Sequence, residues 1–122
     1  MLQTLDPAKA YRMVDFDARV GGLAGPDLVR LCFEEIDAAL DRALWAHDRQ
    51  RTELRYKSLE RAQLGVSALL LGLDRSHPAA ASLDTFYRSL VTRLMASRRA
   101  FDPADVAEVR RDMADVRQSF FG

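Results

Sequence analysis

Few side chains in this sequence have the types and spacing that catalysis or metal binding requires. Such chemistry needs converging groups: a nucleophile beside a base, paired carboxylates in a cleft, or several metal ligands. The single cysteine, Cys32, falls within an apolar helical stripe, which favours an inert buried thiol over a nucleophile. His47 lies at an expected helix end and His77 in an expected loop, so the two histidines are poor material for a metal site.

The charged clusters offer no better candidate. Glu34, Asp37 and Asp41 are spaced along one helix face, as on a solvated surface, and no histidine lies among them to complete a metal motif. The pairs Arg98–Arg99 and Arg110–Arg111 point in different directions on their helices, and no glycine-rich phosphate loop is present. We therefore expect no enzymatic activity, no cofactor and no metal. A small enzyme that uses the cysteine or the acidic face is an alternative, which thiol-reactivity measurements would test.

Composition sets the class of protein. The chain has 122 residues, 48% of them hydrophobic, which is enough for one domain, residues 1–122, with a core of its own. Alanine, leucine and arginine far outnumber valine, isoleucine and threonine, so helices are favoured over strands. The 18 basic and 18 acidic residues cancel, which argues against nucleic acid as a partner because phosphate binding needs a basic surplus.

Neither a secretory signal nor a membrane span is visible in the sequence. The N-terminus lacks a basic region followed by an apolar one. The longest nearly apolar run, residues 66–73, is far shorter than the ~20 residues that a membrane helix needs. We expect a cytosolic protein without membrane insertion.

The prolines divide the chain into helices. Pro7, Pro26, Pro78 and Pro103 each follow a plausible cap, where the missing N–H of proline costs nothing, and a further helix must begin between residues 48 and 52. The expected helices span about residues 7–19, 26–47, 52–73, 78–100 and 103–120. The last four have similar lengths and short connections, which predicts an all-α fold, an antiparallel up-down four-helix bundle over residues 26–122. Residues 1–25 would form a short helical cap with a glycine-rich, flexible hinge.

Apolar residues at three- and four-residue steps mark the faces expected to form the core. The residues expected to be largely buried are Phe33, Ile36, Leu59, Val66, Leu90, Leu94, Val109 and Val116. A second stripe, Leu64, Ala68 and Leu71, lies on the other side of its helix, and a thinner one contains Leu31 and Trp45. Such stripes belong either to a broad core or to a groove for an amphipathic partner helix. The N-terminal segment, with Tyr11, Val14 and Phe16, could cover that groove when no partner is bound.

Three motifs in order resemble the flagellar secretion chaperone family FliS. Ala8-Lys9-Ala10-Tyr11 is similar to the segment ending in tyrosine that opens the family. The run from Ala24-Gly25-Pro26 to Leu31-Cys32-Phe33, and then Phe86-Tyr87-x-x-Leu90-Val91-x-Arg93-Leu94, resemble two of its helical motifs. The chain departs from the family at Glu34-Glu35, at Ser89 and in the shorter connection 75–78. The resemblance covers residues 8–120.

The resemblance implies a cytosolic export chaperone. Proteins of this family bind the disordered C-terminal segment of flagellin, prevent premature polymerisation and deliver flagellin to the flagellar type III export apparatus. Contacts with export-gate components or flagellar regulators are further expectations. The residues expected to bind the partner are Tyr11, Val14, Leu28, Leu31, Trp45, Leu64, Ala68 and Leu71. The alternative is a helical adaptor or regulatory bundle with a globular partner, which would not capture an isolated flagellin peptide.

Overall fold

The computed structural model describes residues 25–121, which form four α-helices. These are α2 (Gly25–Asp48), α3 (Thr52–Leu71), α4 (Ala80–Arg99) and α5 (Pro103–Phe121). No strand occurs within this part of the chain, so the prediction of an all-helical bundle is confirmed. The predicted N-terminal cap and nearly all of the hinge lie outside the described residues and stay predictions.

Local hydrogen bonds set where the last two helices begin. The carboxylate of Asp102 accepts the N–H groups of Ala104 at 3.1 Å and Asp105 at 3.3 Å, which caps α5 at the expected place. Helix α4 starts at Ala80, two residues later than expected. Its start is displaced because His77 Nδ1 accepts the N–H of Ala79, and the His77 carbonyl accepts that of Ala80, both at 3.0 Å. Pro78 therefore lies in a turn rather than in the helix.

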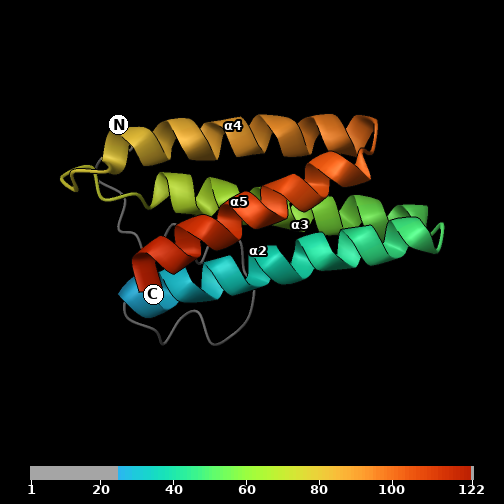
Figure 1. The fold of residues 1–122 in the computed structure, drawn as a ribbon, viewed down its shortest axis with the longest axis horizontal. Helices are drawn as coiled ribbons and strands as arrows, with labels where there is room; N and C mark the ends of the chain where they lie inside the picture. Colours follow the sequence, from blue (N-terminus) through green and yellow to red (C-terminus); the bar gives the residue numbers. More distant parts are fainter. Residues whose placement is uncertain (1–24, 122) are drawn as a thin grey trace.

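A tight turn reverses the chain between α2 and α3. Gln50 has a φ of 57°, in the left-handed region that residues other than glycine rarely adopt. The N–H of Arg51 reaches back to the carbonyl of Ala46 at 2.8 Å, which closes the end of α2. Helix α3 then starts at Thr52 and returns antiparallel to α2 (Figure 1).

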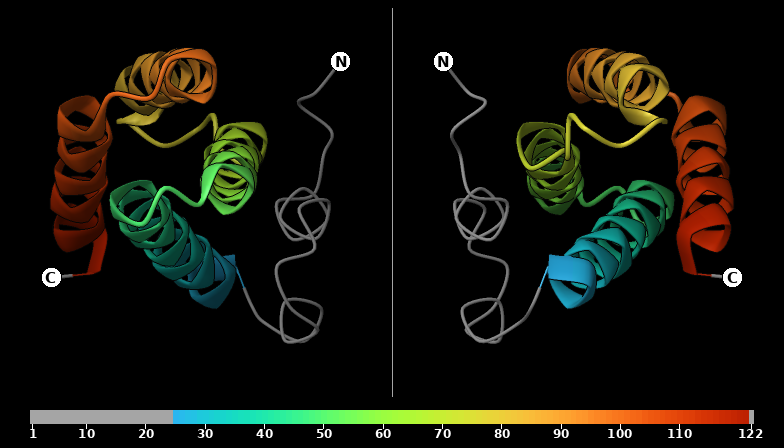
Figure 2. Two further views of the ribbon diagram at one scale, coloured as in Figure 1. Left: turned by 90° about the vertical axis from the view of Figure 1, so that its right-hand side faces the viewer. Right: turned by 90° about the vertical axis from the view of Figure 1, so that its left-hand side faces the viewer.

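The four helices alternate in direction and surround one core. Seen along the bundle, α2, α3, α4 and α5 follow one another around its axis (Figure 2). Among helices that are neighbours around the axis, contacts are most extensive between α2 and α3 and least extensive between α4 and α5. The cause is visible in Figure 1, where α5 runs obliquely across the other helices, from the end of α4 to the beginning of α2.

The core contains most of the residues expected there. The buried ones are Phe33, Ile36, Leu59, Val66, Leu90, Leu94 and Val109. Val116 is only half-buried and packs on the edge of the core, so its predicted burial is overstated. The oblique course of α5 explains this, since its C-terminal half lies against α2 and away from α4.

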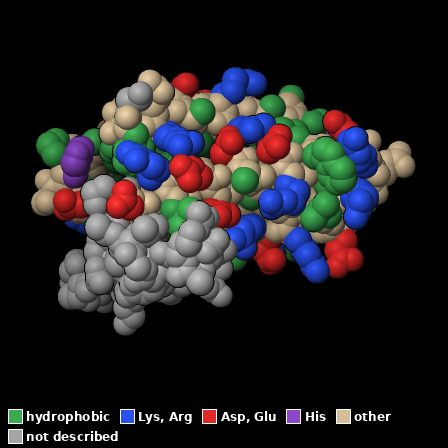
Figure 3. All heavy atoms as spheres, turned by 90° about the horizontal axis from the view of Figure 1, so that it is seen from below, with side chains coloured by type: hydrophobic (Ala, Val, Ile, Leu, Met, Phe, Trp, Pro, Cys, Tyr) green, Lys and Arg blue, Asp and Glu red, His purple; other side chains and the backbone are tan. Residues whose placement is uncertain are grey.

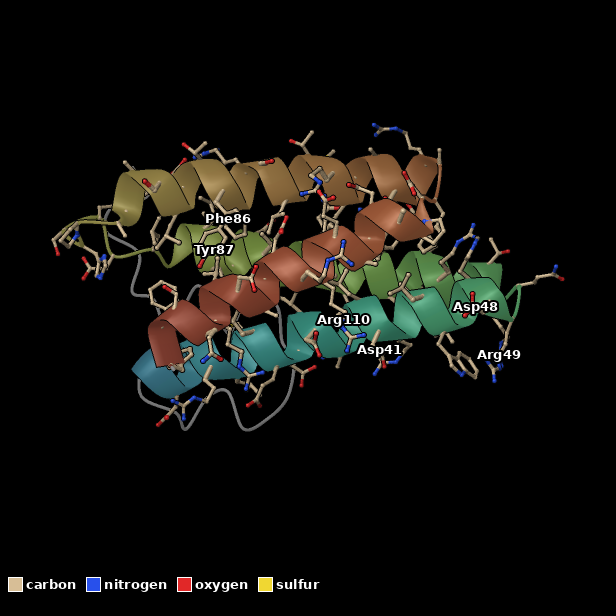
Figure 4. All side chains as sticks on the ribbon, viewed as in Figure 1. Asp41, Asp48, Arg49, Phe86, Tyr87 and Arg110 are labelled. Atoms are coloured by element: carbon tan, nitrogen blue, oxygen red, sulfur yellow. The ribbon has the colours of Figure 1, made fainter. Side chains whose placement is uncertain are left out.

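Ion pairs attach α5 to its neighbours. Arg110 contacts Asp37 at 2.7 Å and Asp41 at 3.0 Å, and the labelled Asp41 and Arg110 lie close together between α2 and α5 in Figure 4. Arg117 of α5 reaches Glu34 at 3.1 Å. The side chains of Asp37, Asp41 and Glu34 stay 43%, 66% and 48% exposed, so the expected solvated face is confirmed, and α5 brings two guanidinium groups against it.

Candidate partner-binding face

The structure separates the predicted partner-binding residues into two groups. Tyr11 and Val14 lie outside the described residues. Among the others, Leu64 is 48% exposed, Trp45 is 42% exposed and Leu71 is half-buried, so these three are available to a partner. The remaining predicted residues are buried members of the core and are not a surface stripe: Leu28, Leu31 and Ala68.

The seam between α2 and α3 explains why part of the predicted stripe is buried. Glu35 and Arg61, 3.5 Å apart, mark where the two helices face each other. Leu31 precedes Glu35 by one turn and Ala68 follows Arg61 by two turns, so both lie on this same seam in the antiparallel pair. Gly65 is buried there too, and small residues let the helices approach closely enough to enclose Leu31.

Beyond the Glu35–Arg61 pair the seam opens into a groove. The groove has a volume of about 330 Å³, and its walls combine leucine side chains with charged ones. The lining residues are Arg42, Leu54, Lys57, Ser58, Glu60, Arg61 and Leu64. Leu64 is thus part of a real recess, which fits an apolar side chain of a partner segment. Three of the lining side chains are basic and one is acidic.

Trp45 stands at the end of this seam with arginines stacked on it. The guanidinium carbons of Arg49 and Arg51 lie 4.5 and 5.8 Å from the centroid of the Trp45 ring. The labelled Asp48 and Arg49 mark this end of α2 in Figure 4. Figure 3 shows hydrophobic side chains at the same end of the molecule, bordered mainly by Lys and Arg and by a few acidic groups.

Sequence reasoning identified Trp45 but missed its two arginines. Arg49 follows Trp45 by four residues, and its N–H donates to the Trp45 carbonyl at 3.3 Å just after α2 ends. This helical spacing places the two side chains together and could have identified the stack. Arg51 follows the helix end, and its position depends on the left-handed conformation of Gln50. No sequence periodicity predicts that contact.

A second recess lies at the opposite end of the bundle, where α2 begins. It is a cavity of about 430 Å³ that all four helices and the α3–α4 connection border. Its walls are mainly apolar, with Asp74 and His77 as the charged or titratable members. The lining residues are Gly25, Val29, Leu69, Gly72, Leu73, Asp74, His77, Leu83, Tyr87, Phe120 and Phe121. Helix α3 therefore borders the groove with residues between 54 and 64 and this cavity with its last turn.

The described residues offer no cluster of metal ligands, and their cysteine is buried. No group of three or more His, Cys, Asp and Glu side chains that could hold a metal occurs within residues 25–121. Cys32 is buried, and burial, helped by the charge of Glu35, raises the pKa of its thiol to about 12. A thiol with such a pKa is neutral at physiological pH and is a weak nucleophile.

We expect the Cys32 thiol of the native protein to react with a disulfide reagent at pH 8 at least about tenfold more slowly than the thiol of the unfolded chain. The reaction slows because the pKa of the thiol rises from 9.0 to about 12 on folding, which lowers the fraction of reactive thiolate. Above pH 9 the thiol ionises in the unfolded chain but not in the folded one. The free energy of unfolding should therefore fall as the pH rises from 9 toward 12. Absorbance of the released thiol measures both rates, and equal rates would mean that Cys32 is accessible.

The model of the family described as "FliS: Flagellar protein FliS" matches residues 7–121, nearly the whole chain. The chain belongs to the FliS family. This confirms the resemblance that the three sequence motifs indicate, and it makes the protein a member of a family of flagellar export chaperones. A search by sequence among curated proteins gives no match. None of the helices in the described part is long and apolar enough to cross a membrane.

Proposed function

We propose that this FliS-family protein is a cytosolic chaperone for flagellin. It binds the C-terminal segment of flagellin before assembly, prevents premature polymerisation and delivers the subunit to the flagellar type III export apparatus. The single observation that carries the proposal is the family match over residues 7–121. Contacts with export-gate components or with flagellar regulators belong to the delivery step of the same proposal.

The α2–α3 face supports the binding step. Leu64 and Trp45 are exposed, and the groove beside Leu64 offers leucine and charged side chains to an amphipathic segment. A disordered segment that folds on this face loses conformational entropy and recovers free energy from the apolar surface that it buries. While bound, its apolar side is covered and cannot pair with a second flagellin.

Titration of the full-length protein with a peptide of the flagellin C-terminal segment tests the proposal. We expect saturable binding by calorimetry with a negative heat-capacity change, and a gain of helical circular dichroism beyond the sum of the components. A peptide of the same composition in scrambled order is the matched control. Binding of folded flagellin that lacks the segment, together with no binding of the peptide, would favour an adaptor for a globular partner instead.

We further propose that Tyr11 and Val14 belong to a detachable N-terminal cap that partly occupies the partner site. Removal of residues 1–20 is expected to leave the four-helix bundle folded, because the core described above comes from residues 28–113. The same truncation is expected to change the affinity for the flagellin peptide. Thermal melting and peptide titration measure the two properties, and an unfolded truncated protein would show that the segment is part of the core.

A further inference from the structure

The outer face of α2 carries charges of opposite sign on its two sides. Residues seven positions apart nearly superimpose along a helix, so Asp41 and Asp48 form one row. Arg42 and Arg49 form another, because Arg49, just after α2 ends, keeps the helical spacing through its N–H bond to the Trp45 carbonyl at 3.3 Å. The carboxylate row lies on the side of α5, where Asp41 pairs with Arg110. The arginine row lies on the side of α3, where Arg42 lines the groove. Trp45 lies between the two rows.

The arginines on the α3 side are not neutralised by carboxylates of the described residues. Arg42, Arg49 and Arg51 form no ion pair with another residue in the range 25–121, whereas Arg93 of α4 contacts three carboxylates of α5 within 3.3 Å. Stacking on Trp45 orders Arg49 and Arg51 without satisfying their charge.

The acidic residues near these arginines either form ion pairs with other residues or lie on the α5 side of α2. Glu53 contacts Lys57 at 3.0 Å and Glu60 contacts Arg98 at 3.4 Å, while Asp48 belongs to the row on the α5 side. The groove end of the seam therefore has unpaired positive charge beside exposed apolar surface. Tryptophan and arginine are also the residue types enriched where partners bind most tightly.

We propose that this basic end, made by Arg42, Trp45, Arg49 and Arg51, binds carboxylates of the segment that enters the α2–α3 groove. The inference rests on the proposed function and specifies the chemistry of its partner: the flagellin segment is acidic where it passes Trp45. An apolar residue of the segment fills the recess beside Leu54 and Leu64. Acidic residues about one helical turn away pair with the arginines, which sets the direction of the segment along α3.

The test uses the full-length protein with Arg42→Glu and Arg49→Glu together, and a peptide of the flagellin C-terminal segment. We expect the double variant to bind the peptide at least about tenfold more weakly at low salt. The difference should shrink as ionic strength rises, since exposed charges are screened over about 10 Å at 0.1 M salt. A peptide with its Asp and Glu replaced by Asn and Gln should lose affinity for the wild type and not for the variant.

Arg111→Glu with Arg99→Glu is the matched control, because both arginines are exposed, form no ion pair among residues 25–121 and lie on α5 and α4. The control reproduces the change in net charge and should bind with nearly wild-type affinity. Equal weakening by the two double variants would overturn the inference. So would tight binding of the peptide that is unchanged by salt and by replacement of the peptide's Asp and Glu. Neither result would contradict the proposed chaperone function. A wild type that binds no flagellin peptide at any salt concentration would instead contradict the proposed function. Thermal melting verifies that both double variants are folded.

Discussion

Replacement of Leu94 by alanine is expected to lower the free energy of unfolding by about 2–5 kcal/mol. The side chain is fully buried, with 0% of its surface exposed, in the core to which all four helices contribute. Truncation removes apolar contacts and leaves a cavity that the surrounding helices fill only partly. Leu90, 1% exposed and one turn earlier on α4, should show a loss of the same size. Chemical denaturation measures both.

Met95→Ala is the matched control for this experiment. Met95 is the next residue on α4 but is 42% exposed, so its truncation should change stability by no more than about 0.5 kcal/mol. Near-native stability of the Leu94 variant would show that the face of α4 assigned to the core is wrong. Reduced flagellin binding in a Leu90 or Leu94 variant would reflect instability rather than a lost contact.

Leu64→Asp combined with Leu71→Asp is expected to cause the largest loss of flagellin binding. Each leucine contributes about 1–2 kcal/mol if it fills or covers an apolar site on the partner. Leu64 is 48% exposed, so its replacement alone should change stability by no more than about 0.5 kcal/mol. Leu71 is half-buried, and the double variant should therefore melt at a slightly lower temperature than the single one.

Peptide titration and thermal melting together decide what these leucines do. Met95→Asp, an equally polar change at an exposed apolar site on α4, should leave binding unchanged. A double variant that melts like the wild type and has lost binding supports the α2–α3 face as the partner site. A double variant that does not fold places the leucines in the core, and unchanged binding means that the partner docks elsewhere.

The helices and most of the core follow from local patterns in the amino-acid sequence. Proline at a helix start and apolar residues at three- and four-residue steps are local signals, and the physics behind them acts within one or two turns. Asp102 caps α5 as expected, and Ile36, Leu90 and Leu94 are buried as expected. The order and spacing of three motifs also identified the family, which the match over residues 7–121 confirms.

The candidate binding face was only half predictable, because a helix's own periodicity does not show how far its neighbours cover it. Leu64, Ala68 and Leu71 have the same stripe spacing, yet Ala68 is enclosed at the seam with α2 and Leu64 is exposed. The difference arises where Gly65 and Ala68 let two helices approach closely, a property of the pair of helices. The apolar periodicity of α3 alone therefore could not predict which of its leucines are exposed to a partner.

The pairing of the charged side chains depends on how the helices pack against one another. Asp37 and Asp41 are paired because α5 runs obliquely across α2 and brings Arg110 to them from about 70 positions away in the chain. Arg51 joins Arg49 on Trp45 because Gln50 takes a left-handed conformation at the turn. The sequence around Arg110 and Arg51 does not show that one is paired with carboxylates and the other is not. Distant packing and a single backbone angle determine whether an arginine's charge is neutralised within the fold or remains available to a partner.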